Sequence, residues 1–475
     1  MNNKLERKFG LFTAICMVVG IVIGSGVFFK AQDILNITRG NMPMGILAWA
    51  IGGVIMLVCI LAFSAMAQRY ERVNGVVDYS EAVVGRKYAY MMGWFMTMIY
   101  YPAMTSVLAW LSARYTLVFI TSCWPDFPLL IPASQGGCVI GPECIALMLL
   151  FMCCSYGLNA LSPKLAGHFQ TTTTVIKLVP LGLMAVGGII SGLVSPTHLL
   201  KSNFATASVE HGGMSSLLAA VCATAFAYEG WIIATSINSE LKNSKKNLPR
   251  ALVLGGIVVM TVYISYYVGV AGGASVDVLR ENGATTAFTN VFGGVLGNVL
   301  NLFVAISCMG TLNGLMLGST RGMYSIAIRG EGPRAETFAQ VDKKTNMAHN
   351  SAVIGLLLCA AWGVYFYLSQ LAGTLDGLVV FRGTALESAA FKFDSSEIPI
   401  ITIYAMYLPI FVMWMKKEKT LGAVQRFVLP VLAFLGSCFM VYACIVRHKM
   451  GNVWYLIMFA VVMAIGALFM KKEKV

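Results

Sequence analysis

Two glycine-containing segments inside long apolar stretches carry the residue types that could bind a small molecule. The first, residues 22–28, reads VIGSGVF, and the second, residues 226–231, reads FAYEGW with the carboxylate of Glu229 at its centre. Glycine costs a helix about 1 kcal/mol relative to alanine, so we expect both helices to open here. An opened helix exposes backbone N–H groups at the start of its second half, where the positive end of the helix dipole favours a carboxylate.

Each segment also has a purely structural interpretation. Gly20, Gly24 and Gly26 could serve only to let helices pack closely in a membrane. A charge at Glu229 costs about 2.5–3.5 kcal/mol on insertion scales, so this carboxylate needs a cationic partner, a proton or water. It could simply be protonated and bonded to a neighbouring helix. Two interrupted segments of the same kind favour the binding interpretation over close packing.

Together the two segments predict a site for a zwitterion. The amide groups of residues 24–26 would hold a carboxylate, while free carbonyls near Val22 and Phe226, with Glu229, would hold an ammonium group. An amino acid has both groups. The predicted substrate-binding residues are Val22, Ile23, Gly24, Ser25, Gly26, Phe226, Ala227, Glu229 and Gly230.

The elements that must position these residues are membrane-spanning helices. Of the 475 residues, 58% are hydrophobic and 12% are charged, whereas soluble domains have about 25% charged residues. A hydrocarbon core about 30 Å thick needs roughly 20 apolar residues per helix. Suitable stretches lie near 11–36, 43–67, 88–121, 143–161, 168–193, 214–238, 251–274, 288–328, 350–369, 396–415, 426–446 and 452–470. We therefore predict an all-α, polytopic membrane protein with twelve spans in one membrane domain, 1–475, and the lipid bilayer as its surroundings.

The basic residues predict the orientation and exclude a nucleic-acid partner. The 34 Lys and Arg residues exceed the 21 Asp and Glu residues by 13, and they lie mostly in short loops and tails rather than on a recognition helix. They concentrate on the side that holds both termini, so both termini should be cytoplasmic in the plasma membrane. Residues 1–8 run into the first apolar stretch without a cleavage site, so we expect no removable signal peptide.

The positions of the two interrupted spans suggest an internal repeat. Residues 1–195 would form a first five-span unit, residues 212–415 a second, and residues 420–475 two extra spans. The interrupted spans are the first of each unit. Matching interruptions predict an inverted repeat with spans 1 and 6 unwound and the substrate site between them.

Several separated motifs resemble one known family. They are residues 24–28 (GSGVF), Tyr101-Pro102-Ala103 leading to Ala113-Arg114-Tyr115, residues 226–231 (FAYEGW), residues 240–243 (ELKN) followed by residues 247–250 (NLPR), and residues 310–314 (GTLNG). Together they resemble the amino acid-polyamine-organocation (APC) superfamily, and within it the L-type amino acid transporter (LAT) family of light-subunit-like exchangers, here of bacterial type. The resemblance covers most of the chain up to about residue 350.

The resemblance implies a leucine-transporter-like fold, a 5+5 inverted repeat plus two C-terminal helices, and sodium-independent exchange of amino acids. Lys177 resembles the family lysine that stands where sodium-coupled relatives bind an ion, and Tyr263 resembles a family tyrosine near the site. From its position alone, Lys177 could instead extend to the membrane surface. Cys123 lies in the loop through which animal members bond an accessory subunit, but nothing in the sequence supports such a partner here.

The sequence departs from the family pattern at two places. Glu229 stands where many members have glycine or aspartate, and members with an acid there include carriers of cationic amino acids. Its longer side chain could favour a basic substrate or could fill the pocket and favour small ones. Beyond about residue 350 the match fades, so site residues of the tenth span are not assigned.

Three functions compete on these observations. The first is an amino acid exchanger (antiporter), and the second is a proton-coupled amino acid or polyamine carrier in which Glu229 titrates. A membrane-embedded enzyme is disfavoured because the sequence has neither a His-Glu-x-x-His nor a Gly-x-Ser-x-Gly motif.

Cysteine and histidine positions predict no metal site and no cofactor. None of the twelve cysteines has a partner at a two-residue gap, and the five histidines are expected at span ends or in loops, apart from any carboxylate cluster. Cys123, Cys138 and Cys144 fall in one loop, where a disulfide could form.

Overall fold

The computed structural model describes residues 10–70, 75–196, 198–205, 213–235, 241–342, 347–368 and 393–471. Within these residues, eleven helices are long and apolar enough to cross a membrane, or twelve if one bent pair counts as a single span. The prediction of an all-α protein with twelve spans is therefore confirmed. Both terminal tails and most of the 370–395 linker lie outside the described residues.

The bent pair is the first span. Helix α1 (Leu11–Val22) ends at the start of the glycine segment, α2 (Gly26–Ile37) begins at its last glycine, and the two axes differ by 42°. Ile23 takes an extended conformation with φ −73° and ψ 98°, which ends the helical path. The chain is thus non-helical where the GSG sequence predicted an opening.

The remaining spans follow the predicted stretches with shifted ends. They are α3 (Met42–Arg69), Arg86–Cys123, Gly137–Leu161, Leu165–Val194, Met214–Thr235, α13 (Ser244–Gly273), α16 (Gly294–Ala327), α18 (His349–Phe366), α19 (Ile398–Lys417), Val424–His448 and α21 (Met450–Leu468).

Several of these spans are built from more than one helical element. Their elements are α5 (Arg86–Phe95) with α6 (Tyr101–Cys123), α7 (Gly137–Ile140) with α8 (Pro142–Leu161), α9 (Pro163–Leu183) with α10 (Ile189–Val194), α12 (Met214–Tyr228), and α20 (Leu429–His448). Single π-helical turns, Met96–Tyr100, Met184–Gly188 and Val424–Val428, join α5 to α6, join α9 to α10 and precede α20.

Short helices connect the spans. They are α4 (Val76–Val83), α11 (Leu199–Ala205), α14 (Val276–Asn282), α15 (Ala284–Phe292) and α17 (Ala335–Phe338). The stretch 288–328, predicted as one span, is divided because Gly293 has φ +86°, a conformation that glycine adopts without steric cost. Its first residues belong to α15, and the span itself begins at Gly294.

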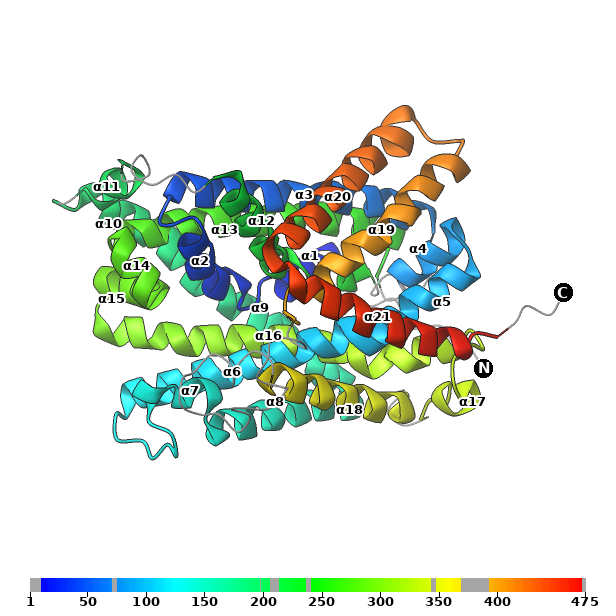
Figure 1. The fold of residues 1–475 in the computed structure, drawn as a ribbon, viewed down its shortest axis with the longest axis horizontal. Helices are drawn as coiled ribbons and strands as arrows, with labels where there is room; N and C mark the ends of the chain where they lie inside the picture. The colour runs from blue at the N-terminus through cyan, green and yellow to red at the C-terminus, as the bar shows by residue number, and fades with distance from the viewer. Residues whose placement is uncertain are drawn as a thin grey trace.

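The long helix α16 forms the centre of the bundle together with α6. It also packs on α8, α9 and α18, while α1 contacts α9, α13 and α16 (Figure 1). Close approach depends on small residues: a Cβ at Gly310 of α16 would lie 2.5 Å from the hydroxyl oxygen of Thr173 on α9. The first half of the broken span is therefore enclosed by other helices.

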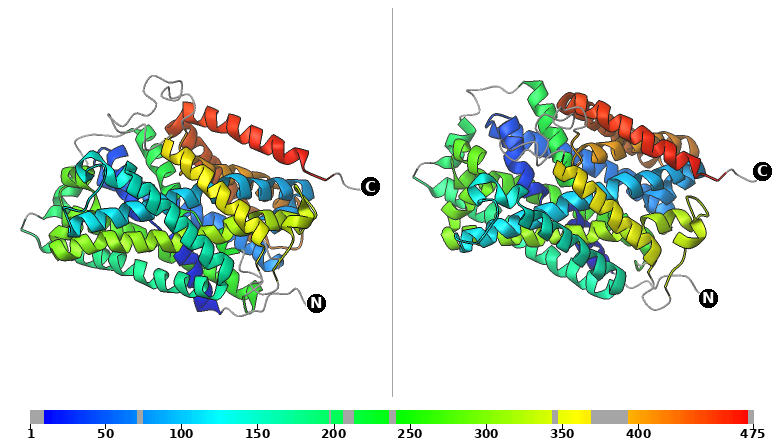
Figure 2. Two further views of the ribbon diagram at one scale, coloured as in Figure 1. Left: turned by 90° about the horizontal axis from the view of Figure 1, so that it is seen from below. Right: turned by 60° about the horizontal axis from the view of Figure 1, so that its bottom comes forward.

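The outer surface of the bundle is apolar. On α18, Val353, Leu357 and Val364 are 46%, 58% and 57% exposed, and their spacing places them on one helix face. Helix α21 lies at the edge of the bundle, where it packs mainly on α5 and α20 (Figure 2). Apolar side chains directed outward are what a bilayer accommodates and water does not.

Candidate functional site

The break between α1 and α2 exposes main-chain groups inside the protein. Ser25 is completely buried, and its carbonyl accepts hydrogen bonds from the amides of Phe28 (3.0 Å) and Phe29 (2.8 Å), which starts the turn of α2. The first N–H groups of a helix have no acceptor within that helix. Those at Gly26 and the following residues stand at the positive end of the α2 dipole, as a carboxylate seat requires.

A second break follows α12. The helix ends at Tyr228, Glu229 is extended with φ −81° and ψ 163°, and Gly230 has φ +107°. Glycine is required at Gly230 on two counts, since that φ disfavours side chains and a Cβ would lie 3.0 Å from Ile21 of α1. The chain therefore turns sharply where the FAYEGW sequence places its glycine.

Glu229 lies fully inside the protein and faces a tyrosine. Its Oε1 accepts a hydrogen bond of 2.6 Å from the hydroxyl of Tyr100, while Oε2 has no hydrogen-bond partner among the described residues. One oxygen of Glu229 is thus hydrogen-bonded to a neighbouring span, as the structural interpretation of this carboxylate expected. The second oxygen remains available to a ligand or a proton.

Both breaks border one pocket inside the bundle. Seven of its thirteen lining residues were predicted from the sequence, namely Val22, Gly24, Ser25, Gly26, Phe226, Glu229 and Gly230. The other six are Ile21, Tyr100, Met104, Leu108, Thr311 and Leu315. The structure therefore brings residues of four spans, the first, third, sixth and eighth, to one place.

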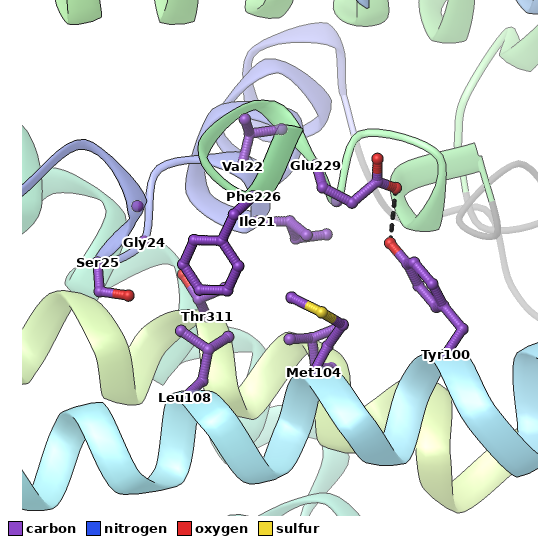
Figure 3. A pocket seen from close by; sticks show the side chains of 13 residues that line it. Ile21, Val22, Gly24, Ser25, Tyr100, Met104, Leu108, Phe226, Glu229 and Thr311 are labelled. Carbon is purple, nitrogen blue, oxygen red and sulfur yellow. Dashed lines mark hydrogen bonds between the residues drawn. The ribbon is translucent and has the colours of Figure 1, made fainter. Parts of the chain in front are cut away.

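The cavity has polar ends and an apolar middle. In Figure 3, Ser25 lies at one end and Glu229 with Tyr100 at the other, with Phe226 and Met104 between them. A small molecule with charged groups separated by carbon matches this pattern of polar and apolar lining.

Lys177 contacts the end of α1 rather than the membrane surface. Its side chain is 0% exposed, and its ammonium group donates to the carbonyls of Gly20 (2.6 Å) and Ile23 (2.5 Å) and to the hydroxyl of Thr311 (3.2 Å). These carbonyls lie at the end of α1. Carbonyls at the end of a helix have no N–H donor within that helix. The alternative in which Lys177 extends to the interface does not hold in this structure.

Tyr263 of α13 joins the two breaks directly. Its buried hydroxyl lies 3.1 Å from the carbonyl of Val22 and 3.0 Å from that of Ala227. Ile23 and Ala227 are not among the lining residues of the cavity, and their carbonyls instead accept from Lys177 and Tyr263. The sequence predicted free carbonyls near Val22 and Phe226, and in the structure the hydroxyl of Tyr263 contacts the carbonyl of Val22 and that of Ala227, the residue after Phe226.

Six lining residues of the cavity were not predicted from the sequence. Tyr100 directly precedes the Tyr101-Pro102-Ala103 motif, and Thr311 lies inside the GTLNG motif. The family motifs could therefore have indicated both residues. Met104 and Leu108 are one turn apart on α6 and face the cavity together. Nothing in the apolar sequence of α6 indicates which face that is.

We expect Tyr263→Phe to slow transport without unfolding the protein. The substitution removes a hydroxyl that lies within hydrogen-bond distance of a carbonyl at each break, and a hydrogen bond of this kind contributes about 0.5–1.5 kcal/mol. Exchange of radiolabelled substrate should fall about three- to tenfold. Tyr266→Phe is the matched control, because the hydroxyl of Tyr266 on the same helix is buried without a hydrogen-bond partner in the described part of the chain. Equal losses in both variants would contradict the bridging role.

The three cysteines of the predicted loop are free. Cys123 is exposed, Cys138 and Cys144 are buried, and each carries a thiol rather than a disulfide. Cys138 instead lies 3.8 Å from the hydroxyl of Thr121.

Comparison with known proteins agrees with this geometry. The chain is 28% identical over 461 residues to the serine/threonine exchanger SteT of Bacillus subtilis, covering 95% of this chain and 94% of that protein. It is 25% identical to the large neutral amino acids transporter small subunit 2 of Mus musculus (72% of this chain, 62% of that protein) and 24% identical to the cystine/glutamate transporter of Pongo abelii (72% and 65%). The family model described as amino acid permease matches residues 9–468. The resemblance to the APC superfamily and its LAT-type members is therefore confirmed, and the chain belongs to the amino acid permease family.

Proposed function

We propose that this protein is a secondary amino acid transporter, a sodium-independent exchanger that works by alternating access. The observation that carries the proposal is the single cavity bordered by both helix breaks. Spanning helices interrupted in this way are the means by which transporters present main-chain groups to a charged substrate. The residues that line the cavity do not include a nucleophile paired with a base as in an enzyme. We therefore propose transport rather than catalysis.

The substrate's carboxylate would bind at Gly24, Ser25 and Gly26, and its ammonium group would face carbonyls at the ends of α1 and α12. Terminal carbonyls of a helix lack intrahelical donors, so those not already held by Lys177 or Tyr263 can accept from an ammonium group. The side chain would then extend between Phe226 and Met104 toward Glu229. This arrangement uses both polar ends of the cavity.

Lys177 supports independence from sodium. Unwound carbonyls and helix C-terminal ends are the groups that coordinate a sodium ion in broken-helix transporters. Here the ammonium group of Lys177 occupies carbonyls of that kind, at Gly20 and Ile23, together with the Thr311 hydroxyl. The amine of Lys177 would take the place of an ion supplied by the medium.

Alternating access would proceed by movement of the first and sixth spans against the rest. We propose the inverted repeat of residues 1–195 and 212–415, with 420–475 as two extra spans, as the basis of this movement, and the breaks at Gly24 and Gly230 as its hinges. The chain would lie in the plasma membrane with both termini cytoplasmic. Cys123 is a free, exposed thiol, and we propose no accessory subunit on it.

Trans-stimulated efflux from proteoliposomes tests exchange. A thermal-shift screen across the twenty amino acids and common polyamines identifies the ligand first, because a bound ligand raises apparent stability by mass action. The labelled ligand, trapped inside vesicles, should leave faster when unlabelled amino acid is present outside. Release that no external amino acid accelerates would rule out exchange.

Proton-coupled uptake is the second candidate, and Oε2 of Glu229, which has no hydrogen-bond partner in the described part of the chain, favours it. Under the exchanger proposal, Glu229→Gln should keep neutral amino acid exchange within about threefold and leave its pH profile unchanged, since the amide oxygen can still accept from Tyr100. Glu143→Gln, at the start of α8 and away from the cavity, is the control. A Glu229→Gln protein that has lost the pH dependence shown by both wild type and control would instead establish Glu229 as the proton carrier.

A further inference from the structure

A second group of polar side chains lies where α2, α12, α19 and α20 meet. Glu397, at the N-terminus of α19, is completely buried and pairs with Lys30 of α2 and with Arg447 of α20, whose Nε lies 2.8 Å from Oε2. His448 places its Nε2 2.9 Å from the same oxygen. The sequence expectation that the histidines lie apart from any carboxylate cluster is therefore wrong for His448, which lies beside Glu397 and Asp394.

Two buried cysteines complete this group. Cys222 of α12 has its sulfur 3.8 Å from Oε2 of Glu397, and Cys444 lies one helical turn before His448 on α20. The two sulfurs and a ring nitrogen of His448 all lie within 4.8 Å of one another. Oxygens of Glu397 and Asp394 lie within the same distance of the His448 ring nitrogen. Two thiols, an imidazole and a carboxylate thus converge from three helices.

We propose that Cys222, Cys444 and His448, with Glu397 as the fourth ligand, form a binding site for a divalent metal ion of the zinc class. Zinc takes four sulfur, nitrogen or oxygen ligands in a tetrahedron, and its bond lengths set neighbouring ligand atoms roughly 3.3–3.8 Å apart. Cys222 and His448 lie 3.8 Å and 2.9 Å from Oε2 of Glu397, and the two sulfurs and the ring nitrogen lie within 4.8 Å of one another. Side-chain rotations would have to bring the sulfurs closer to reach the zinc spacing.

The charges around the site permit an ion there. Lys30 and Arg447 carry two positive charges, which Glu397 and Asp33 balance, with Arg447 2.9 Å from Asp33. Two thiolates and a neutral imidazole would in turn balance a divalent cation. When the imidazole of His448 is neutral, metal binding with release of the two thiol protons adds no net charge to a buried place, which is the usual obstacle to burying an ion.

The site would connect the sixth span to the C-terminal helices. Cys222 lies on α12, the helix that ends at the break before Glu229, while Cys444 and His448 lie on α20. A shared ion would hold α12 against α20 and the N-terminus of α19, and so stabilise the folded protein in proportion to its affinity.

The same side chains could serve only as a hydrogen-bonded cluster. Cys444 lies 3.3 Å from the side-chain oxygen of Asn452, and Cys222 and His448 both contact Glu397, so each polar group has a partner without an ion. The two interpretations differ in whether added metal binds.

The test uses purified, reduced, full-length protein with Cd²⁺ and Zn²⁺ as probes. Cd²⁺ should give an ultraviolet cadmium–thiolate absorption that saturates with one tightly bound equivalent and that Zn²⁺ displaces, and Zn²⁺ should raise Tm. The double variant Cys222→Ser, Cys444→Ser should lose both signals. His448→Gln should weaken Zn²⁺ binding at least about tenfold, as loss of a metal-site partner does.

Cys438→Ser is the matched control, since Cys438 lies on α20 but outside the cluster, and it should bind as wild type does. Wild-type protein that shows neither a Tm shift nor a tight cadmium equivalent overturns the proposal, whether or not the double variant folds. So does a double variant that keeps both signals, because the metal would then be held by other cysteines.

Discussion

Ser25→Leu is expected to reduce amino acid binding by at least about a hundredfold, equivalent to about 2.8 kcal/mol. Ser25 is completely buried and lines the cavity between Gly24 and Gly26. A leucine side chain there would occupy the space in which the substrate's carboxylate must approach the N–H groups of α2. The ligand loses the charge-assisted hydrogen bonds of the seat, which are the strongest it can make in this cavity.

Binding is measured on purified protein with a radiolabelled ligand, beside two controls. Ser25→Ala leaves the main-chain donors accessible and should bind within about threefold of wild type. Ser64→Leu places the same bulk at a buried serine of α3, outside the cavity, and reports the general cost of overpacking. Normal binding by a folded Ser25→Leu protein would show that the carboxylate seat lies elsewhere.

Lys177→Ala is expected to lower the exchange rate by at least about a hundredfold while the protein remains folded. The ammonium group holds the carbonyls of Gly20 and Ile23 and the hydroxyl of Thr311. Hydrogen bonds to a charged group contribute about 1.5–3 kcal/mol each. Without them the end of α1 loses its hydrogen bonds to α9 and keeps the direct bond from the Thr311 hydroxyl of α16 to the carbonyl of Ile23, so the break is held less firmly in one geometry.

Exchange rate and Tm are measured together, because they separate an effect of the lysine on transport from an effect on folding stability. Lys177→Arg keeps the charge but not the compact shape of an ammonium group, and it should recover only part of the activity. Lys201→Ala, at an exposed lysine of α11, controls for loss of positive charge alone. Wild-type exchange by Lys177→Ala would refute the role assigned to its ammonium group.

The spans and the two segments that border the cavity could be read from the sequence because both depend on local composition. A span is a run of apolar residues of sufficient length, and the glycine of Gly24 or Gly230 acts on the backbone at its own position. The carboxylate of Glu229 was equally visible as the only acid expected deep within a span. The ends of spans are harder to predict. Gly293 divides one apolar stretch into α15 and α16, so this span begins later than its composition indicates.

The contacts across the bundle were decided by tertiary structure alone. The partner of Glu229 is Tyr100, Tyr263 joins the carbonyls of Val22 and Ala227, and Cys222 meets Cys444 and His448 across more than two hundred residues of sequence. In a soluble helix the buried face is marked by its apolar residues. In a membrane the lipid and the protein interior are both apolar, so no such periodicity marks the face that points inward. The sequence by itself therefore determined how many membrane spans there are and where the first and sixth are interrupted, and only packing in three dimensions decided which side chains meet at the cavity and at the cysteine–histidine cluster.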